Sequence, residues 1–147
     1  MRRLLPPPLL LLLVLALVAL HYFHPASPDR MASPIWFAGI LGVFAIAGLA
    51  WARVRFSQSE SEIMTFNTPR NLVTDGPFAI SRNPMYLSML LLVTSAALVV
   101  DRTCGLIAPL IFFAAANWWY IPFEEKAAAA TFGQGYDVYR KRVRRWF

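Results

Sequence analysis

Four long stretches without a single charged residue constrain what this chain can fold into. Each is close to the roughly 17–25 residues that a helix needs to cross the hydrocarbon core of a bilayer. Only 15% of the residues are charged, against about 25% in an average soluble domain, so little sequence remains for a soluble core. We therefore predict four transmembrane helices, at Leu4–Leu20, Ile35–Ala52, Pro84–Val100 and Gly105–Phe123.

The first of these stretches also has features of a signal peptide. Met1–Phe23 combines a basic start with a leucine-rich run. The run is long, however, and no small-residue cleavage site follows it. His21, Tyr22 and Phe23 are typical of a helix end at the membrane interface. We therefore expect a retained helix.

The positive charges fall mainly on one side of the predicted helices. Only Arg30 and Arg102, of the 14 Lys and Arg residues, fall on the other side. Lys and Arg favour the cytoplasmic side of a membrane, so we expect a multi-pass protein with both termini and the central loop in the cytoplasm. The net charge of +6 is concentrated in the tail. Attraction to anionic membrane lipids explains this charge without nucleic acid.

The length allows a single membrane domain with four parts. We expect two N-terminal helices over 1–52, a cytoplasmic loop over 53–83, a transmembrane hairpin over 84–123 and a cytoplasmic or interfacial tail over 124–147.

The tail carries a helical pattern of apolar residues. Large apolar side chains recur at alternating four- and three-residue spacings, as on one face of a helix, at Phe132, Tyr136, Tyr139, Val143 and Trp146. Basic residues occupy the other faces, which predicts an amphipathic helix in the membrane interface. Gly133 and Gly135 predict a break from the preceding helix. The expected fold is an all-α integral membrane protein with four transmembrane helices and a C-terminal amphipathic interfacial helix.

Metal and disulfide chemistry find little support in the sequence. Cys104 is the single cysteine, so no intramolecular disulfide forms. His21 and His24 are three residues apart, but Asp29 is the only carboxylate near them. Because structural metal sites need several ligands, we interpret the two histidines as ordinary interfacial residues and expect no metal.

Polar residues gather where the third helix begins and the fourth ends. The link Asp101–Cys104 is so short that these helices must form an antiparallel hairpin, which brings Arg82 and Glu124 to one membrane face. Pro84 is typical of a first helical turn. Taken singly, the arginine, the acids and the aromatic residues have ordinary explanations as snorkelling, solvated or interfacial side chains. Together, beside a long polar loop, these residues predict a functional site, because charged groups near hydrocarbon are costly and often mark function. Carboxylates and aromatic faces would attract a cationic cofactor to it.

Two segments carry a family resemblance. LVTDGPFAISRNPMYLSMLLL, from Leu72, and IPFEEKAAAATFGQGYDVYRKRVRRWF, from Ile121, resemble the isoprenylcysteine carboxyl methyltransferase and phospholipid methyltransferase group of integral membrane enzymes. The resemblance spans Leu72 to Trp146, about half of the chain. It implies S-adenosylmethionine as the cofactor and a lipid or other small amphiphilic molecule as the methyl acceptor.

The resemblance also implies roles for particular residues. Glu124 matches the acid that holds the cofactor, and Arg82 matches a residue that orders the site or pairs with the cofactor's carboxylate. An amine acceptor must lose a proton, which Glu125 or Glu124 would accept, whereas a carboxylate or thiolate acceptor needs no base. The candidate catalytic residues are therefore Arg82, Glu124 and Glu125. The implied cofactor-binding residues are Leu72, Val73, Phe78, Asn83, Pro84, Tyr86 and Glu124.

Two positions depart from the family pattern. Asn83 stands where the eukaryotic enzymes have histidine, although both side chains can donate a hydrogen bond. Tyr120 stands where the protein-carboxyl methylating members have an arginine implicated in substrate binding. The second departure argues against an isoprenylcysteine carboxylate as the substrate.

Two other classes remain as alternatives. Steroid and sterol reductases have a similar Arg-His-Pro-x-Tyr segment and bind NADPH, but their tyrosine is followed by Gly-Glu, whereas Leu87 and Ser88 follow Tyr86 here. A non-catalytic four-helix protein such as a transporter should have an ionisable residue within a span, and the four stretches contain none. The sequence therefore favours a methyltransferase.

Overall fold

The computed structural model describes residues 5–23, 31–58 and 71–147. Every regular element in this part of the chain is a helix. Some residues named in the sequence predictions lie outside the described part: Met1, Leu4, His24, Asp29 and Arg30.

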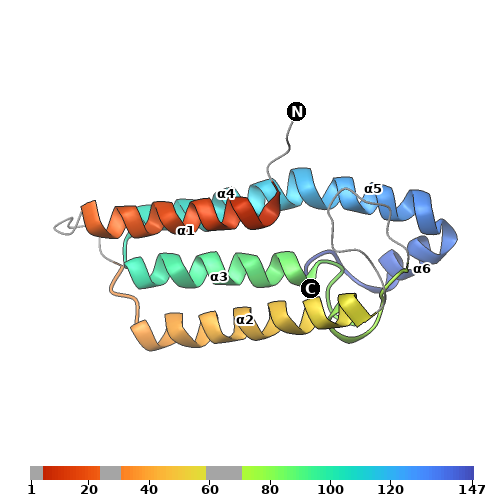
Figure 1. Ribbon diagram of the computed structural model, residues 1–147, viewed down its shortest axis with the longest axis horizontal. Helices are drawn as coiled ribbons and strands as arrows, with labels where there is room; N and C mark the ends of the chain where they lie inside the picture. Colours follow the sequence, from red (N-terminus) through yellow and green to blue (C-terminus); the bar gives the residue numbers. More distant parts are fainter. Residues whose placement is uncertain (1–4, 24–30, 59–70) are drawn as a thin grey trace.

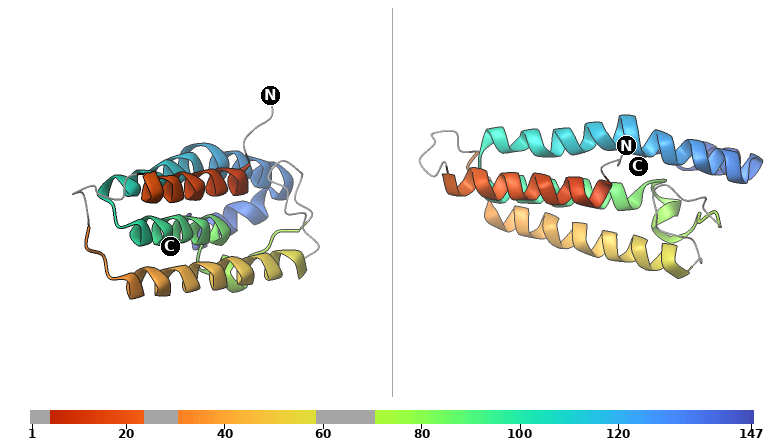
Figure 2. Two further views of the ribbon diagram at one scale, coloured as in Figure 1. Left: turned by 60° about the vertical axis from the view of Figure 1, so that its left-hand side comes forward. Right: turned by 45° about the horizontal axis from the view of Figure 1, so that its top comes forward.

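The described chain is built around four long helical segments that lie side by side (Figure 1). The first three are α1 (Pro6–Phe23), α2 (Ile35–Gln58) and α3 (Pro84–Val100). The fourth runs without a break from Thr103 to Phe132. It consists of η2 (Thr103–Leu106), α4 (Ile107–Ala115), the π-helical turn η3 (Ala116–Tyr120) and α5 (Ile121–Phe132). In Figure 2 the end of this segment reaches past the other three helices, and α6 (Gln134–Arg142) turns back from it.

Three of these segments are long and apolar enough to cross a membrane: Pro6–Phe23, Ile35–Gln58 and Thr103–Phe132. The helix Pro84–Val100 is apolar but shorter, at 17 residues. The all-helical membrane fold is therefore confirmed, with three to four candidate spans. The bounds predicted for the third helix agree with α3, whereas α2 continues past Ala52 to Gln58, because no proline or glycine interrupts Arg53–Gln58.

Small residues allow α2 and α3 to approach closely. The buried face of α2 consists of alanines seven residues apart, Ala38, Ala45 and Ala52. A Cβ atom added at Gly42 would lie 2.9 Å from Ser95 Oγ, so only glycine fits against that hydroxyl group. Ser95 Oγ in turn donates a hydrogen bond of 2.8 Å to the carbonyl oxygen of Ala38. Close backbone approach and interhelical hydrogen bonds are what hold helices together in a bilayer.

The turn between α3 and α4 is tied to the residues that precede α2. Asp101 has a left-handed conformation (φ 57°) and ends α3. Its Oδ1 atom accepts a hydrogen bond of 3.0 Å from the backbone N–H of Ser33, whose Oγ donates to the carbonyl oxygen of Leu98 at 2.8 Å. The predicted antiparallel hairpin of α3 and the fourth segment is visible in Figure 1.

The π-helical turn ends just before a proline in the first turn of α5. Pro122 has no N–H group, so one main-chain hydrogen bond is missing at this position. In a π-helix the N–H of each residue bonds to the carbonyl group five residues earlier, which for Pro122 is that of Asn117. The Asn117 carbonyl oxygen accepts instead from Arg145 Nη1 at 3.3 Å.

The tail differs in part from the prediction. The chain does break at Gly133, where φ is 52°, but α6 ends at Arg142 and Val143 is extended. The expected helical face therefore does not continue to Trp146. Tyr136, Tyr139 and Val143 are buried in one cluster with Leu72, Ala128, Ala129 and Phe132. Because the apolar face of α6 packs on the protein itself, an interfacial location of this helix is not confirmed.

Candidate active site

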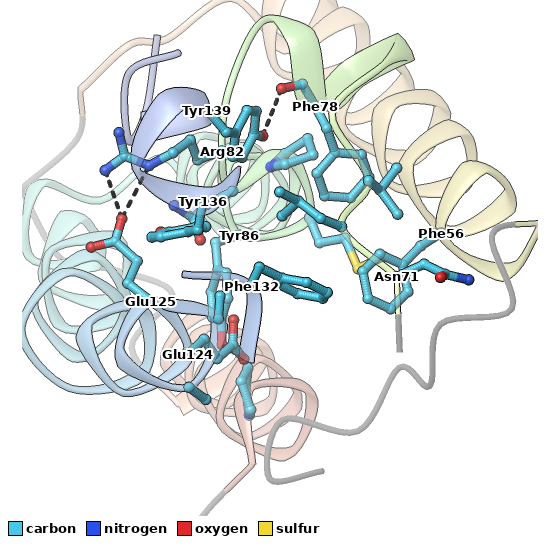
Figure 3. Close-up of a pocket in the computed structure, with 18 of the residues that line it drawn as sticks. Phe56, Asn71, Phe78, Arg82, Tyr86, Glu124, Glu125, Phe132, Tyr136 and Tyr139 are labelled. Atoms are coloured by element: carbon cyan, nitrogen blue, oxygen red, sulfur yellow. Dashed lines mark hydrogen bonds and ion pairs between the residues drawn. The ribbon is translucent and has the colours of Figure 1, made fainter. Parts of the chain in front are cut away.

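A cavity of about 230 Å³ lies at the end of the bundle where α3 begins (Figure 3). Its wall combines the starts of α1 and α3 with the end of α2, one side of α5, and α6. The residues before η1 (Gly76–Ala79) and Phe78 within it complete the wall. Aromatic rings and a few polar groups dominate the lining that Figure 3 labels: Phe56, Asn71, Phe78, Arg82, Tyr86, Glu124, Glu125, Phe132, Tyr136 and Tyr139.

Every candidate residue from the sequence lines this one cavity. They come from three separate parts of the chain and comprise Leu72, Val73, Phe78, Arg82, Asn83, Pro84, Tyr86, Glu124 and Glu125. The structure thus brings the predicted residues together, while their roles in binding and catalysis stay predictions.

Sequence reasoning missed other parts of the wall. Ala127 and Ala128 lie one turn after Glu124, so helical periodicity offered a signal for them. Phe132, Tyr136 and Tyr139 belong to the periodic tail face, which was predicted to lie in the membrane interface. No sequence signal pointed to the remaining lining residues: Pro6, Pro7, Phe56, Asn71, Met85 and Met89.

Glu124 presents a carboxylate to this aromatic cavity. It lies in the first turn of α5, and its Oε1 atom accepts a hydrogen bond of 2.8 Å from the hydroxyl group of Tyr86. Tyr86 is buried in the first turn of α3, which Pro84 begins, and its ring stacks on Tyr120 with centroids 6.2 Å apart. The carboxylate is therefore held in a defined direction. A carboxylate beside aromatic faces is a favourable environment for a cation.

Glu125 also lines the cavity, but two guanidinium groups bind its carboxylate oxygens. Its Oε1 atom accepts from Arg82 Nη2 at 2.7 Å, and its Oε2 atom accepts from Arg145 Nη2 at 2.6 Å. The Glu125 side chain is only 19% exposed. Charge-assisted hydrogen bonds of this length are among the strong ones. Glu125 therefore ties α5 to both arginines, and its predicted role as a proton acceptor stays a prediction.

Arg82 joins the start of α3 to the tail. Its backbone N–H donates to the Arg144 carbonyl oxygen at 2.9 Å. Its Nη1 atom donates to the carbonyl oxygens of Arg140 and Val143 at 3.1 and 2.7 Å. A cation at these last carbonyl groups of α6 also complements the helix dipole. These contacts match the predicted ordering role of Arg82 more closely than a pairing with the cofactor's carboxylate.

Tyr139 fixes η1 to α6. Its hydroxyl group donates a buried hydrogen bond of 2.7 Å to the carbonyl oxygen of Phe78, which places the Phe78 ring in the cavity wall (Figure 3). Burial raises the pKa of Tyr139 and also that of Tyr136. Both tyrosines are therefore neutral hydrogen-bonding groups at physiological pH.

Comparisons with known proteins agree with the resemblance seen in the sequence. The family model described as phospholipid methyltransferase matches residues 35–135. An uncharacterized protein of Haemophilus influenzae is 34% identical over 62 residues, which are 42% of this chain and 98% of that protein. The family match covers α2, α3 and the long fourth segment, and so includes both elements that supply Tyr86 and Glu124. The chain belongs to the phospholipid methyltransferase family and is a membrane methyltransferase.

Proposed function

We propose that this protein transfers a methyl group from S-adenosylmethionine to a lipid or other small amphiphilic acceptor at the cytoplasmic surface of the membrane. The family supports methyl transfer. The observation that carries the choice of cofactor is the Glu124 carboxylate, held by Tyr86 in a cavity lined by aromatic rings.

The residues present fit such a cofactor. When bound, S-adenosylmethionine supplies a methyl group on a positively charged sulfur atom. Glu124 offers the opposite charge, and the side chains of Tyr86 and Phe132 lie near it in Figure 3. Leu72, Val73 and Phe78 supply an apolar wall for the uncharged parts. We therefore assign cofactor binding to these residues, with Glu124 as the charged contact.

The chain's own residues contribute mainly by alignment. The Tyr86 hydrogen bond fixes the Glu124 carboxylate, and the ion pairs of Glu125 fix α5 against the start of α3. Holding both reactants in one geometry supplies much of the rate enhancement in a displacement of this kind. Among the described residues, Glu124 is the cavity carboxylate without an arginine partner. If the acceptor is an amine, Glu124 therefore receives its proton.

Charged and aromatic residues support a cytoplasmic, interfacial location of this cavity. Arg55, Arg82 and the basic residues of α6 lie at the same end of the bundle. Trp118 and Trp119 are 70% and 63% exposed on the π-helical turn near this end, as expected for an aromatic belt at the interface. By the positive-inside rule this end faces the cytoplasm, which puts both termini there.

A titration of the purified protein distinguishes this proposal from its alternative. We expect calorimetry to give saturable binding of S-adenosylhomocysteine, the reaction product, and no binding of NADPH. The family match does not favour the NADPH-dependent reductase. Binding of NADPH alone by a folded sample would overturn the methyltransferase proposal and restore the reductase.

A further inference from the structure

Four tail residues, Val143–Trp146, cross the end of the bundle beside the start of α3 (Figure 1). We name this segment the tail strap. On one side its backbone binds the residues that lead into α3. The Arg144 carbonyl oxygen accepts from the Arg82 N–H at 2.9 Å. The Arg145 carbonyl oxygen accepts from Asn83 Nδ2 at 3.1 Å and from Ser81 Oγ at 3.2 Å.

On its other side the strap binds the π-helical turn. Arg145 Nη1 donates to the Asn117 carbonyl oxygen at 3.3 Å, and Pro122, five residues later, has no N–H to offer this oxygen. Trp146 Nε1 donates to Asn117 Oδ1 at 3.1 Å, and its ring packs on Phe113 with centroids 5.2 Å apart. The strap therefore connects the start of α3 to the π-helical turn of the fourth segment through hydrogen bonds.

Arg145 also fixes the rotation of α5. It binds both carboxylate oxygens of Glu125, through Nε at 3.3 Å and through Nη2 at 2.6 Å. Successive residues of a helix point about 100° apart, so a fixed Glu125 on the strap side sets the direction of Glu124. That direction is the cavity, where Glu124 meets Tyr86.

We infer that the tail strap is a positioning element of the cofactor pocket, in which Arg145 orients Glu124 by holding Glu125 and the Asn117 carbonyl group. The inference rests on the proposed function for its cofactor. Arg145, Trp146 and Asn117 lie outside the cavity lining, so they act through other residues. The strap also lies beyond the 35–135 match to the family model.

The test compares Arg145→Gln with Arg144→Gln in the full chain. Both variants remove one positive charge from the strap, but the Arg144 side chain is exposed, which makes it the matched control. Hydrogen–deuterium exchange is measured over residues 81–86 and 121–128, and the affinity for S-adenosylmethionine, which carries the sulfonium charge, is measured by calorimetry. A third variant, Arg145→Lys, keeps the charge without the planar fork of donors.

We expect Arg145→Gln to exchange faster than the control in both segments and to bind S-adenosylmethionine about tenfold more weakly. Arg145→Lys should recover part of that affinity. A merely structural role would lower the unfolding midpoint without changing affinity far below it. If Arg145→Gln does not fold, Trp146→Phe keeps the ring packing, removes only the donor to Asn117, and should show the same changes at about threefold.

Three results are decisive. Exchange in Arg145→Gln equal to that in Arg144→Gln would overturn the inference, whether or not the protein binds the probe. Faster exchange with unchanged affinity would also overturn it. If the wild type binds no S-adenosylmethionine, faster exchange in Arg145→Gln would still support the positioning of α3 and α5 by the strap, and the missing affinity would count against the proposed function.

Discussion

Replacing Glu124 by glutamine separates the charge of this side chain from its shape. The amide retains an oxygen that can accept the Tyr86 hydrogen bond, so the cavity wall should keep its geometry. What disappears is the negative charge that faces the aromatic cavity. We expect the variant to fold normally and to bind S-adenosylmethionine much more weakly.

The size of the loss follows from the surroundings of Glu124. Two opposite charges about 4 Å apart attract by about 4 kcal/mol at the effective dielectric constant of a protein surface. Glu124 is only partly buried, and hydrogen bonds to charged groups contribute about 1.5–3 kcal/mol net. We therefore expect a loss of about 2 kcal/mol, which raises the dissociation constant about 30-fold.

The neighbouring acid provides the matched comparison. Glu125→Gln removes the same charge one residue away, but it leaves Arg82 and Arg145 without their common partner. Breaking a partly buried ion pair in this way costs about 2–3 kcal/mol of folding free energy. Thermal unfolding in detergent should therefore show a lower midpoint for Glu125→Gln and an unchanged midpoint for Glu124→Gln.

Calorimetry with S-adenosylmethionine, in the absence of an acceptor, is the assay for the cofactor. S-adenosylhomocysteine lacks the sulfonium charge, so its affinity should fall less in Glu124→Gln. A folded Glu124→Gln variant that binds S-adenosylmethionine within about twofold of the wild type would refute the reasoning, because no charge contact would then exist.

Three further outcomes follow from the packing. Gly42→Leu should destabilise the protein by about 1–3 kcal/mol, because a side chain there collides with Ser95. Gly39→Leu should be neutral, since a Cβ atom at Gly39 has nothing within 4 Å. The unfolding midpoints of the two variants check both expectations. Tyr139→Phe should cost about 1 kcal/mol at neutral pH, measured by denaturant unfolding. Burial raises the pKa of Tyr139, so the stabilising contribution of its neutral hydroxyl group is complete below about pH 10. This contribution is lost as the pH rises toward the folded-state pKa. The stability difference between the wild type and Tyr139→Phe should therefore shrink at alkaline pH. Asp75→Asn should change stability by less than about 1 kcal/mol in the same assay, because its ion pair with Arg55 is exposed.

The helices could be predicted because the bilayer imposes simple requirements on sequence. Uncharged runs of the right length gave the helical segments, and Pro84 fixed the start of α3. The end of α2 was predicted too early, because a charged residue ends a membrane span without ending a helix.

The tail shows where periodicity stops being informative. The spacing of Tyr136, Tyr139 and Val143 predicts a buried face, but it does not say whether lipid or protein covers that face. Here protein covers it, because Gly133 turns α6 back toward Leu72 and Ala128.

The candidate site was predictable in its residues but not in their pairing. Resemblance alone could not tell which acid meets Arg82. The structure pairs Arg82 with Glu125 and leaves Glu124 to Tyr86. That choice depends on the helical rotation after Pro122 and on Arg145, neither of which has a local sequence signal.

Direct observation of methyl transfer tests the central claim. The wild-type protein, reconstituted in bilayers of membrane lipid, is incubated with S-adenosylmethionine labelled in its methyl group, and label is counted in the organic extract. We predict label in the lipid fraction with the wild type, and little with Glu124→Gln. Bilayers that stay unlabelled with a folded wild type that binds the cofactor would contradict a lipid acceptor, and equal labelling by Glu124→Gln would contradict the assigned site.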